Sequence, residues 1–304
     1  MNKNAVWIVI SLAIGLLSLA GCQEAMEPTD TTTSTTAQAL NAATTTHHAT
    51  TKDNKQIAYR VVGSGAQDIV LVHGWSVSGA VYDNLIDELA SSDYRLIIPD
   101  LRGTGESDKP NGGYSLENYL KDIEAVVADA NAADYVVVGH SMGGAIAQKY
   151  AARHASELSA LVLMSPVPAS GFPLPEDIYE LFWASADDPQ LQAFIFTISS
   201  VDLDPADLDH LVADAGTVLP KASRQSLDAW TEADFADMLD QITAPTLVLV
   251  SDDPFMPQAF LQQTVADPIA NAQLEYFSGA GHYLQVEDPE QTSAAIGGFL
   301  TSLP

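Results

Sequence analysis

Hydrophobic positions from residue 56 onward fall into short continuous runs separated by longer stretches with helical spacing. Short runs are typical of strands buried on both faces, and together with a strand over 56–62 they predict strands at 69–72, 95–98, 135–138, 160–164, 246–250 and 274–277. The longer stretches predict helices at 81–89, 116–130, 142–153 and 289–300. Because strands that alternate with helices form parallel sheets, we expect an α/β fold: a mostly parallel sheet with helices on both faces.

The alternation of strand-like apolar runs with helical stretches stops between Ser165 and Asp240, where Pro, Asp and aromatic residues are frequent. Within this stretch Asp204-Pro205-Ala206-Asp207 is a helix start, with a capping side chain, a proline at the first helical position and an acid in the first turn. We therefore expect a helical cap, at about 166–240, inserted between two strands of the sheet.

The N-terminal segment 1–21 predicts a secretory signal. Lys3 precedes an apolar run, Ala5 to Leu19, that is shorter than the roughly 20 residues of a spanning helix. The run ends in Leu19-Ala20-Gly21-Cys22, which resembles a bacterial lipoprotein signal, and Cys22 is the only cysteine of the chain. The resemblance implies cleavage before Cys22 and lipidation of its thiol; an ordinary cleaved signal and an uncleaved helix are the alternatives.

Residues 22–47 are rich in Thr and Ala and lack apolar periodicity, so they predict a disordered tether before a folded domain over 48–304. The lipoprotein resemblance implies a lipid-anchored protein of the bacterial cell envelope. In a Gram-negative source, Gln23 after the lipidated cysteine implies the outer membrane.

The strongly negative net charge of the chain restricts the kinds of molecule that it can bind. Twelve Lys and Arg oppose 40 Asp and Glu, giving a net charge of −28, which argues against nucleic acid and anionic lipid headgroups. The single cysteine excludes an intrachain disulfide. Gly103-Thr104-Gly105 lacks the further glycine and the lysine of phosphate-binding loops, and His47 and His48 have no further ligands nearby, so we expect no nucleotide, metal or organic cofactor.

Gly139-His140-Ser141-Met142-Gly143 matches the pattern G-x-S-x-G, and it lies between a predicted strand and a predicted helix. This context produces a sharp turn that exposes the serine hydroxyl above the sheet, with small residues required on either side. The N-terminal amides of the following helix point toward the same place. Ser141 is therefore the candidate nucleophile.

From about residue 50 to the end, the chain resembles the α/β-hydrolases of the serine esterase, perhydrolase and lactonase group. The shared segments are 73–75 (HGW), 100–107 (DLRGTGES), 139–144 (GHSMGG), 253–257 (DPFMP) and 279–282 (GAGH). The resemblance implies the α/β-hydrolase fold, His282 as general base, and an oxyanion hole made by the backbone N–H groups of Trp75 and Met142. It also implies a loop role for His73 and packing beside the turn for His140.

The acid that orients His282 must follow the serine and precede the histidine in sequence. Asp253 fits the family pattern D-x-x-x-P through Pro257, but the segment before it is about one residue shorter than usual. Asp253 is the favoured acid, and Asp252 stays open.

A serine at the nucleophile position favours acyl transfer through an acyl-enzyme. We expect hydrolysis of carboxylic esters, and the aromatic cap indicates small to medium apolar substrates. The same residues could serve a lactonase, a carbon–carbon bond hydrolase, an amidase or a perhydrolase with haloperoxidase-like activity. A non-catalytic binding module is the alternative from another class.

Overall fold

The computed structural model describes residues 44–89 and 93–303. The predicted signal over 1–21, the lipidation residue Cys22 and most of the predicted tether lie outside the described residues. Among the described residues, no helix is both long and apolar enough to cross a membrane.

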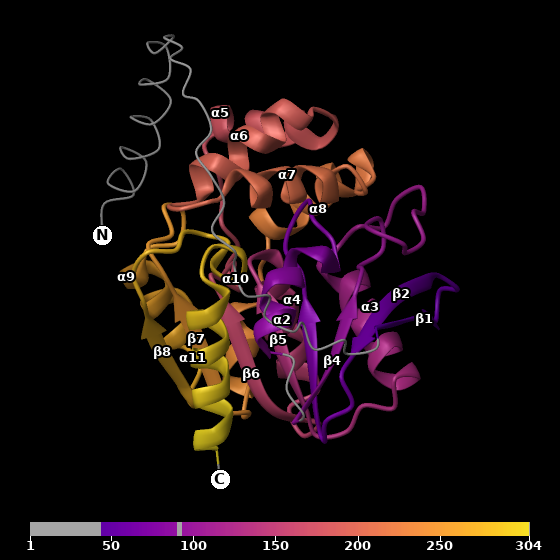
Figure 1. Ribbon diagram of the computed structural model, residues 1–304, viewed down its shortest axis with the longest axis vertical. Coiled ribbons are helices and arrows are strands. Elements are labelled where there is room, and N and C mark those ends of the chain that lie inside the picture. The colour runs from indigo at the N-terminus through magenta and orange to yellow at the C-terminus, as the bar shows by residue number, and fades with distance from the viewer. Residues whose placement is uncertain (1–43, 90–92, 304) are drawn as a thin grey trace, which may run out of the picture. The chain divides into compact units, whose positions relative to one another are not determined.

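An eight-stranded sheet forms the centre of the described part of the chain (Figure 1). Its strands are β1 (Thr45–Thr50), β2 (Gln56–Val62), β3 (Gln67–Val72), β4 (Tyr94–Pro99), β5 (Tyr135–His140), β6 (Leu158–Met164), β7 (Thr246–Val250) and β8 (Ala272–Tyr276). The spatial order is β1-β2-β4-β3-β5-β6-β7-β8, and all pairs from β4 to β8 are parallel. The predicted α/β fold class with a mostly parallel sheet is confirmed.

The first strand corrects the predicted end of the tether at residue 47. Thr45–Thr50 pair antiparallel with β2, which in turn pairs antiparallel with β4, so the sheet includes residues before 48. The His47 ring stacks on Tyr59 with ring centroids 5.2 Å apart. A polar edge strand of this kind has no apolar periodicity, because only one of its side chains, Ala49, is fully buried along with the sheet.

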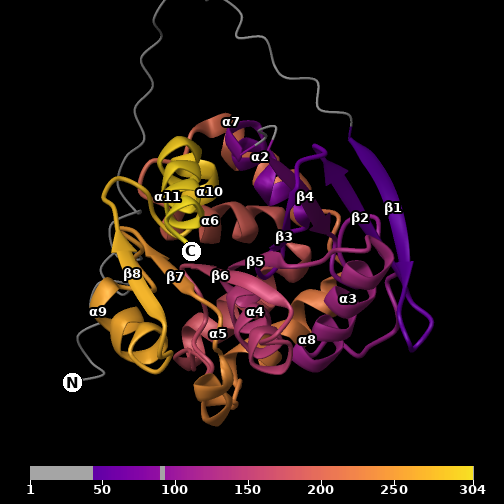
Figure 2. The same ribbon diagram turned by 90° about the horizontal axis from the view of Figure 1, so that it is seen from below.

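Helices cover both faces of the sheet (Figure 2). One face carries α2 (Asp83–Leu89), preceded by η1 (Gly79–Tyr82), together with α10 (Leu284–Glu287) and α11 (Pro289–Ser302). The other face carries α3 (Leu116–Asp129), α4 (Met142–Arg153) and α9 (Gln258–Leu261), which continues into η4 (Gln262–Ala266). The central strands are therefore buried on both sides, as their continuous apolar runs predicted.

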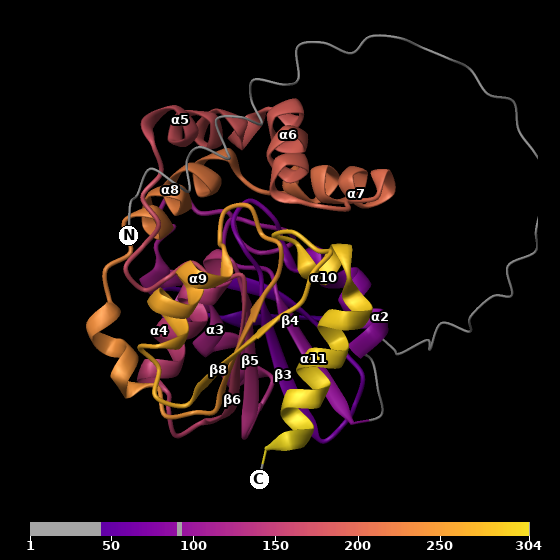
Figure 3. The same cartoon turned by 90° about the vertical axis from the view of Figure 1, so that its left-hand side faces the viewer.

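Between β6 and β7 the chain forms a helical layer above the sheet (Figures 1 and 3). This cap consists of α5 (Glu176–Ala184), η2 (Ser185–Asp187), α6 (Pro189–Ser199), α7 (Pro205–Ala215) and α8 (Pro220–Thr231), and η3 (Ala236–Gln241) leads back to the sheet. Helix α7 begins at Pro205, as predicted, and the Asp204 carboxylate accepts the N–H of Ala206 at 2.8 Å.

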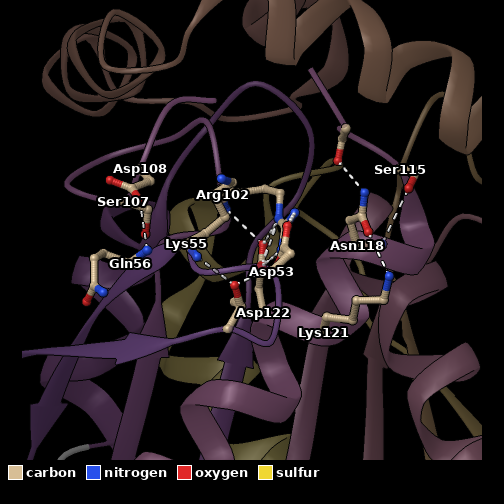
Figure 4. Close-up of polar contacts among 12 residues, drawn as sticks. Asp53, Lys55, Gln56, Arg102, Ser107, Asp108, Ser115, Asn118, Lys121 and Asp122 are labelled. Atoms are coloured by element: carbon tan, nitrogen blue, oxygen red, sulfur yellow. Dashed lines mark hydrogen bonds and ion pairs between the residues drawn. The ribbon is translucent and has the colours of Figure 1, made fainter. Parts of the chain in front are cut away.

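A buried arginine fixes the loop that follows β4 (Figure 4). The Arg102 guanidinium is only 1% exposed and donates to Asp122 of α3, with the closest contact 2.6 Å, and to Asp53 of the β1–β2 turn at 2.9 and 3.1 Å. Two carboxylates around one buried cation satisfy its donors, which removal of one partner would leave unpaired. The Arg102 loop thereby joins α3 to the first hairpin.

The same loop supports the segment that enters the predicted site. The backbone N–H of Leu101 donates to His73 Nε2 at 3.0 Å, and His73 Nδ1 donates to the carbonyl of Gly74 at 2.9 Å. Burial lowers the pKa of His73, so the ring stays neutral and keeps this tautomer. His73 is a structural loop residue that holds Gly74 and Trp75 in place.

The pKa of Asp53 makes one part of this network dependent on pH. The hydrogen bond from Arg102 lowers it from the ordinary value of 3.8 to about 2. The charged form therefore stabilises the fold above about pH 4, and this stabilisation is lost as the pH falls toward 2. We expect Asp53→Asn to lower the Tm at pH 7 by roughly 2–4 °C, as for a partly exposed ion pair worth about 1 kcal/mol.

Thermal unfolding followed by circular dichroism at pH 7, 4 and 2.5 measures this effect, with Asp234→Asn at an exposed acid as the matched control. The difference between Asp53→Asn and the wild-type protein should shrink between pH 4 and pH 2. An equal difference at all three pH values would contradict the assigned pairing with Arg102.

Candidate active site

Ser141 occupies a sharp turn between β5 and α4. Its backbone adopts φ 54° and ψ −119°, a conformation that residues other than glycine rarely adopt. Its N–H donates to the carbonyl of Met164 at 3.0 Å, and its own carbonyl accepts the N–H groups of Gly144 and Val167, each at 2.9 Å. These bonds fix the turn that the sequence pattern predicted.

The two glycines of the pattern are required by close backbone packing. A Cβ on Gly139 would lie 2.4 Å from the carbonyl oxygen of Gly143, and one on Gly143 would lie 2.2 Å from that of Val72. Both separations are well inside van der Waals contact, so any side chain at these positions would push β5, α4 and β3 apart. Ser141 is thus presented at the carboxyl ends of the central strands.

His282 lies on the loop after β8, with its side chain only 11% exposed. Its Nδ1 is 2.6 Å from Oδ2 of Asp253, which follows β7. Its backbone N–H donates to the carbonyl of Ser199 in the cap at 2.8 Å, a contact that the sequence did not predict. Tyr283 packs edge-on against the imidazole, with ring centroids 5.3 Å apart.

The structure separates the two adjacent candidate acids. Asp253 is buried and its second oxygen accepts the backbone N–H groups of Phe255 and Met256 at 2.8 and 3.1 Å. Asp252 is exposed and instead accepts from the Tyr276 hydroxyl at 2.6 Å and the Gly279 N–H at 3.0 Å. Asp253, and not Asp252, faces His282.

Asp253 stays ionised although it is buried. Burial acts to raise the pKa of its carboxyl, but the facing His282, the hydrogen bond to that ring and the two backbone N–H groups together lower it. A charged carboxylate accepts from Nδ1–H, so it fixes the imidazole tautomer that leaves Nε2 free to accept a proton.

His140 packs behind the turn, as the resemblance implied. Its Nε2 donates to the carbonyl of His282 at 2.9 Å, and the two rings have centroids 4.9 Å apart. Burial, together with the nearby His282, lowers the pKa of His140 to about 3. His140 is therefore a neutral support for the backbone of His282.

The amides predicted to form an oxyanion hole belong to the residue after Ser141 and to the loop after β3. Met142 is the first residue of α4, and Trp75 follows the His73-Gly74 loop after β3. In the part of the chain that the structure describes, neither backbone N–H donates to a backbone carbonyl. The Trp75 ring stacks on Phe182 of the cap, and its Nε1 donates to the carbonyl of Ser223 at 2.7 Å.

Ser141 and His282 line one cavity of about 480 Å³, part of it open to solvent, between the sheet and the cap. Its other walls are mainly aromatic: Trp75, Phe172, Phe182, Trp230, Phe255 and Tyr283. Among the described residues no hydrogen bond joins Ser141 Oγ to His282 Nε2; such bonds are often long before substrate binds.

No group of three or more His, Cys, Asp or Glu in the described ranges could hold a metal ion.

Comparisons with known proteins identify the family and the fold. A model of the alpha/beta hydrolase family matches residues 69–295. A non-heme haloperoxidase of Rhodococcus erythropolis is 28% identical over 83% of this chain and 98% of its own length. An esterase of Exiguobacterium antarcticum is 25% identical with a TM-score of 0.78, covering 84% of this chain and 99% of its own. Est816, described as an N-acyl homoserine lactone degrading enzyme, is 27% identical with a TM-score of 0.71, over 83% and 100% of the two chains.

The contact between His282 and Asp253 can be tested without any substrate. A short bond from a ring N–H to a buried carboxylate should move the Nδ1 proton well downfield of the backbone amides in ¹H NMR spectra. We expect Asp253→Asn to abolish that resonance and Asp252→Asn, the adjacent control, to retain it. Loss of the resonance in Asp252→Asn alone would assign the acid to the other residue.

Proposed function

Because the chain belongs to the alpha/beta hydrolase family, we propose that it is a serine hydrolase that cleaves carboxylic esters of small to medium apolar substrates. The observation that carries the proposal is the contact between the buried Asp253 carboxylate and His282, which lines one cavity with the strained Ser141. A serine, an imidazole and a buried acid in this chain order form the arrangement used for acyl transfer.

In the proposed mechanism, Ser141 Oγ attacks the ester carbonyl carbon while His282 Nε2 takes the hydroxyl proton. Asp253 stabilises the imidazolium, and the N–H groups of Trp75 and Met142 stabilise the oxyanion. The tetrahedral intermediate expels the alcohol, which receives the proton from His282, and leaves an acyl-enzyme. Water then attacks the acyl carbon by the same route and releases the acid and free Ser141.

The aromatic cavity supports an apolar acyl or alcohol group as substrate. Buried aromatic walls favour removal of apolar groups from water, at about 25 cal/mol per Å² of apolar surface. The net charge of −28 disfavours polyanionic substrates. We propose small to medium uncharged esters, such as aryl acetates and butyrates.

A second activity is favoured by one observation, the similarity to a protein named non-heme haloperoxidase. If hydrogen peroxide replaces water in attack on the acyl-enzyme, the product is a peracid, which oxidises bromide to hypobromite and returns to the carboxylic acid. This perhydrolase route uses the same Ser141, His282 and Asp253. Bromination of a dye in the presence of acetate, peroxide and bromide would detect it.

The principal test replaces the nucleophile. Ser141→Ala should keep the wild-type circular dichroism spectrum and lose at least about 10³-fold in kcat toward p-nitrophenyl butyrate. A fluorophosphonate probe should label the wild-type protein and not the variant. Parallel assays with lactones and amides rank the alternatives. Near-normal turnover by Ser141→Ala, or absence of labelling in the folded wild-type protein, would overturn the proposal.

We also propose that the protein is anchored to the bacterial cell envelope by lipid on Cys22. The support is the sequence Leu19-Ala20-Gly21-Cys22 after an apolar run. Several acyl chains on one residue give a stable anchor, at about 0.8 kcal/mol per buried CH₂.

Expression of the full chain in a bacterium with a radiolabelled fatty acid tests this anchor. The wild-type protein should incorporate label and sediment with membranes, whereas Cys22→Ser should do neither. Thr33→Ser in the same N-terminal segment is the control and should behave as the wild-type protein. Equal incorporation into Cys22→Ser would contradict the lipoprotein assignment.

A further inference from the structure

One carboxylate, that of Glu287 at the end of α10, accepts four backbone N–H groups. Its Oε2 accepts from Val201 at 2.7 Å, Asp202 at 3.1 Å and Gly281 at 2.9 Å. Its Oε1 accepts from Tyr283 at 3.1 Å. Among the described residues Glu287 has no cationic partner, so these amides take the place of a counter-ion.

The four amides come from two parts of the fold. Gly281 and Tyr283 are the residues on either side of His282, whereas Val201 and Asp202 belong to the loop between α6 and α7 of the cap. Glu287 therefore binds the histidine loop and the cap at once. Each of its bonds is made by a charged acceptor, the stronger class of hydrogen bond.

The two segments are also in direct backbone contact. The N–H of His282 donates to the carbonyl of Ser199 at 2.8 Å. A Cβ on Gly281 would lie 2.7 Å from the same carbonyl oxygen and 2.7 Å from Cα of Ser200. The residues before, at and after His282 are thus all held against the 199–202 segment or against the carboxylate that binds it.

We propose that Glu287 is a positioning residue that fixes the backbone of His282 relative to Ser141 by locking the histidine loop to the cap. The inference rests on the proposed serine hydrolase function. The carboxylate touches neither the imidazole nor the cavity, so its effect passes through the flanking amides. The Asp253 contact orients the ring, and Glu287 fixes the backbone from which the ring extends.

The chemistry requires a carboxylate. Both oxygens of an ionised glutamate accept, whereas a glutamine side chain has one accepting oxygen and one donating NH₂ group. In Glu287→Gln the NH₂ group must face at least one N–H, either that of Tyr283 or the three amides at Oε2. The substitution therefore keeps the size of the side chain and removes at least one of the hydrogen bonds that join the histidine loop to the cap.

The experiment compares Glu287→Gln with Glu290→Gln, which removes one exposed charge from the first turn of α11 and serves as the matched control. We expect Glu287→Gln to lower kcat toward p-nitrophenyl butyrate by about 10- to 100-fold, as a shift of about 1 Å in a catalytic group does. The KM should change less than kcat, because Glu287 itself does not line the cavity. The control should match the wild-type protein in both constants.

A second variant reaches the same contact from the other side. Gly281→Ala leaves Glu287 in place and pushes the histidine loop away from Ser199, so it should reproduce the fall in kcat. Hydrogen–deuterium exchange of the intact protein gives a readout that needs no catalysis. In Glu287→Gln, exchange should quicken in peptides covering 199–202 and 281–283 together and stay unchanged in 115–129.

The outcomes separate a positioning role from simple stabilisation. A folded Glu287→Gln protein with wild-type kcat, measured well below its Tm, would overturn the proposal even if its Tm were lower. Faster exchange in only one of the two segments, 199–202 or 281–283, would also overturn the proposal, because Glu287 would then not couple the cap to the histidine loop. If the wild-type protein hydrolyses no ester, the serine hydrolase proposal fails first, while the exchange data still decide whether Glu287 couples the cap to the histidine loop.

Discussion

The backbone of Ser141 is held in a conformation that its side chain disfavours, and the rest of the site is built around that turn. A non-glycine residue in such a region stores strain of about 1–3 kcal/mol, which the surrounding structure must hold. Here the restraint comes from pairing of β5 between β3 and β6 and from backbone bonds to Met164, Gly144 and Val167. The turn also requires glycine at 139 and 143. A side chain at either position would collide with the backbone of α4 or of β3.

Features set by local sequence could be predicted, and features set by distant contacts could not. Strands buried on both faces appear as apolar runs, so β3 to β7 were located from the sequence, and G-x-S-x-G located the turn. The first residues of β1, 45–47, fell within the predicted tether because an exposed edge strand is polar, and its stability comes from pairing with β2. The short helix α9 and the π-helical turn η4 after it also escaped prediction, since neither is long enough to show a period.

The choice between Asp252 and Asp253 illustrates the same limit. The two acids follow the end of β7, and because one is exposed and the other buried, an error of one residue in the alignment changes which acid faces His282. The sequence offered only the spacing to Pro257, whereas the structure gives each acid different partners: His282 for Asp253, and Tyr276 with Gly279 for Asp252. The contacts of Glu287 with Val201 and Asp202 span more than 80 residues of chain and have no local signature.

Some of the many acidic side chains of this chain hold loops of the site in place. With 40 acids and 12 Lys and Arg, most carboxylates in this chain have no cation available, and several that shape the site bind backbone N–H groups instead. Asp214 of α7 accepts the N–H and hydroxyl of Ser78, next to the Trp75 loop, while Glu287 holds the other side of the cap to the histidine loop. Because both ends of α7 are fixed to loops next to predicted site residues, this helix of the cap is part of the framework that sets the geometry around Ser141. A change in cap packing should therefore alter the chemistry as well as the entry of substrate, and the aromatic cavity and the positions of Trp75 and His282 have to be understood as one packed unit.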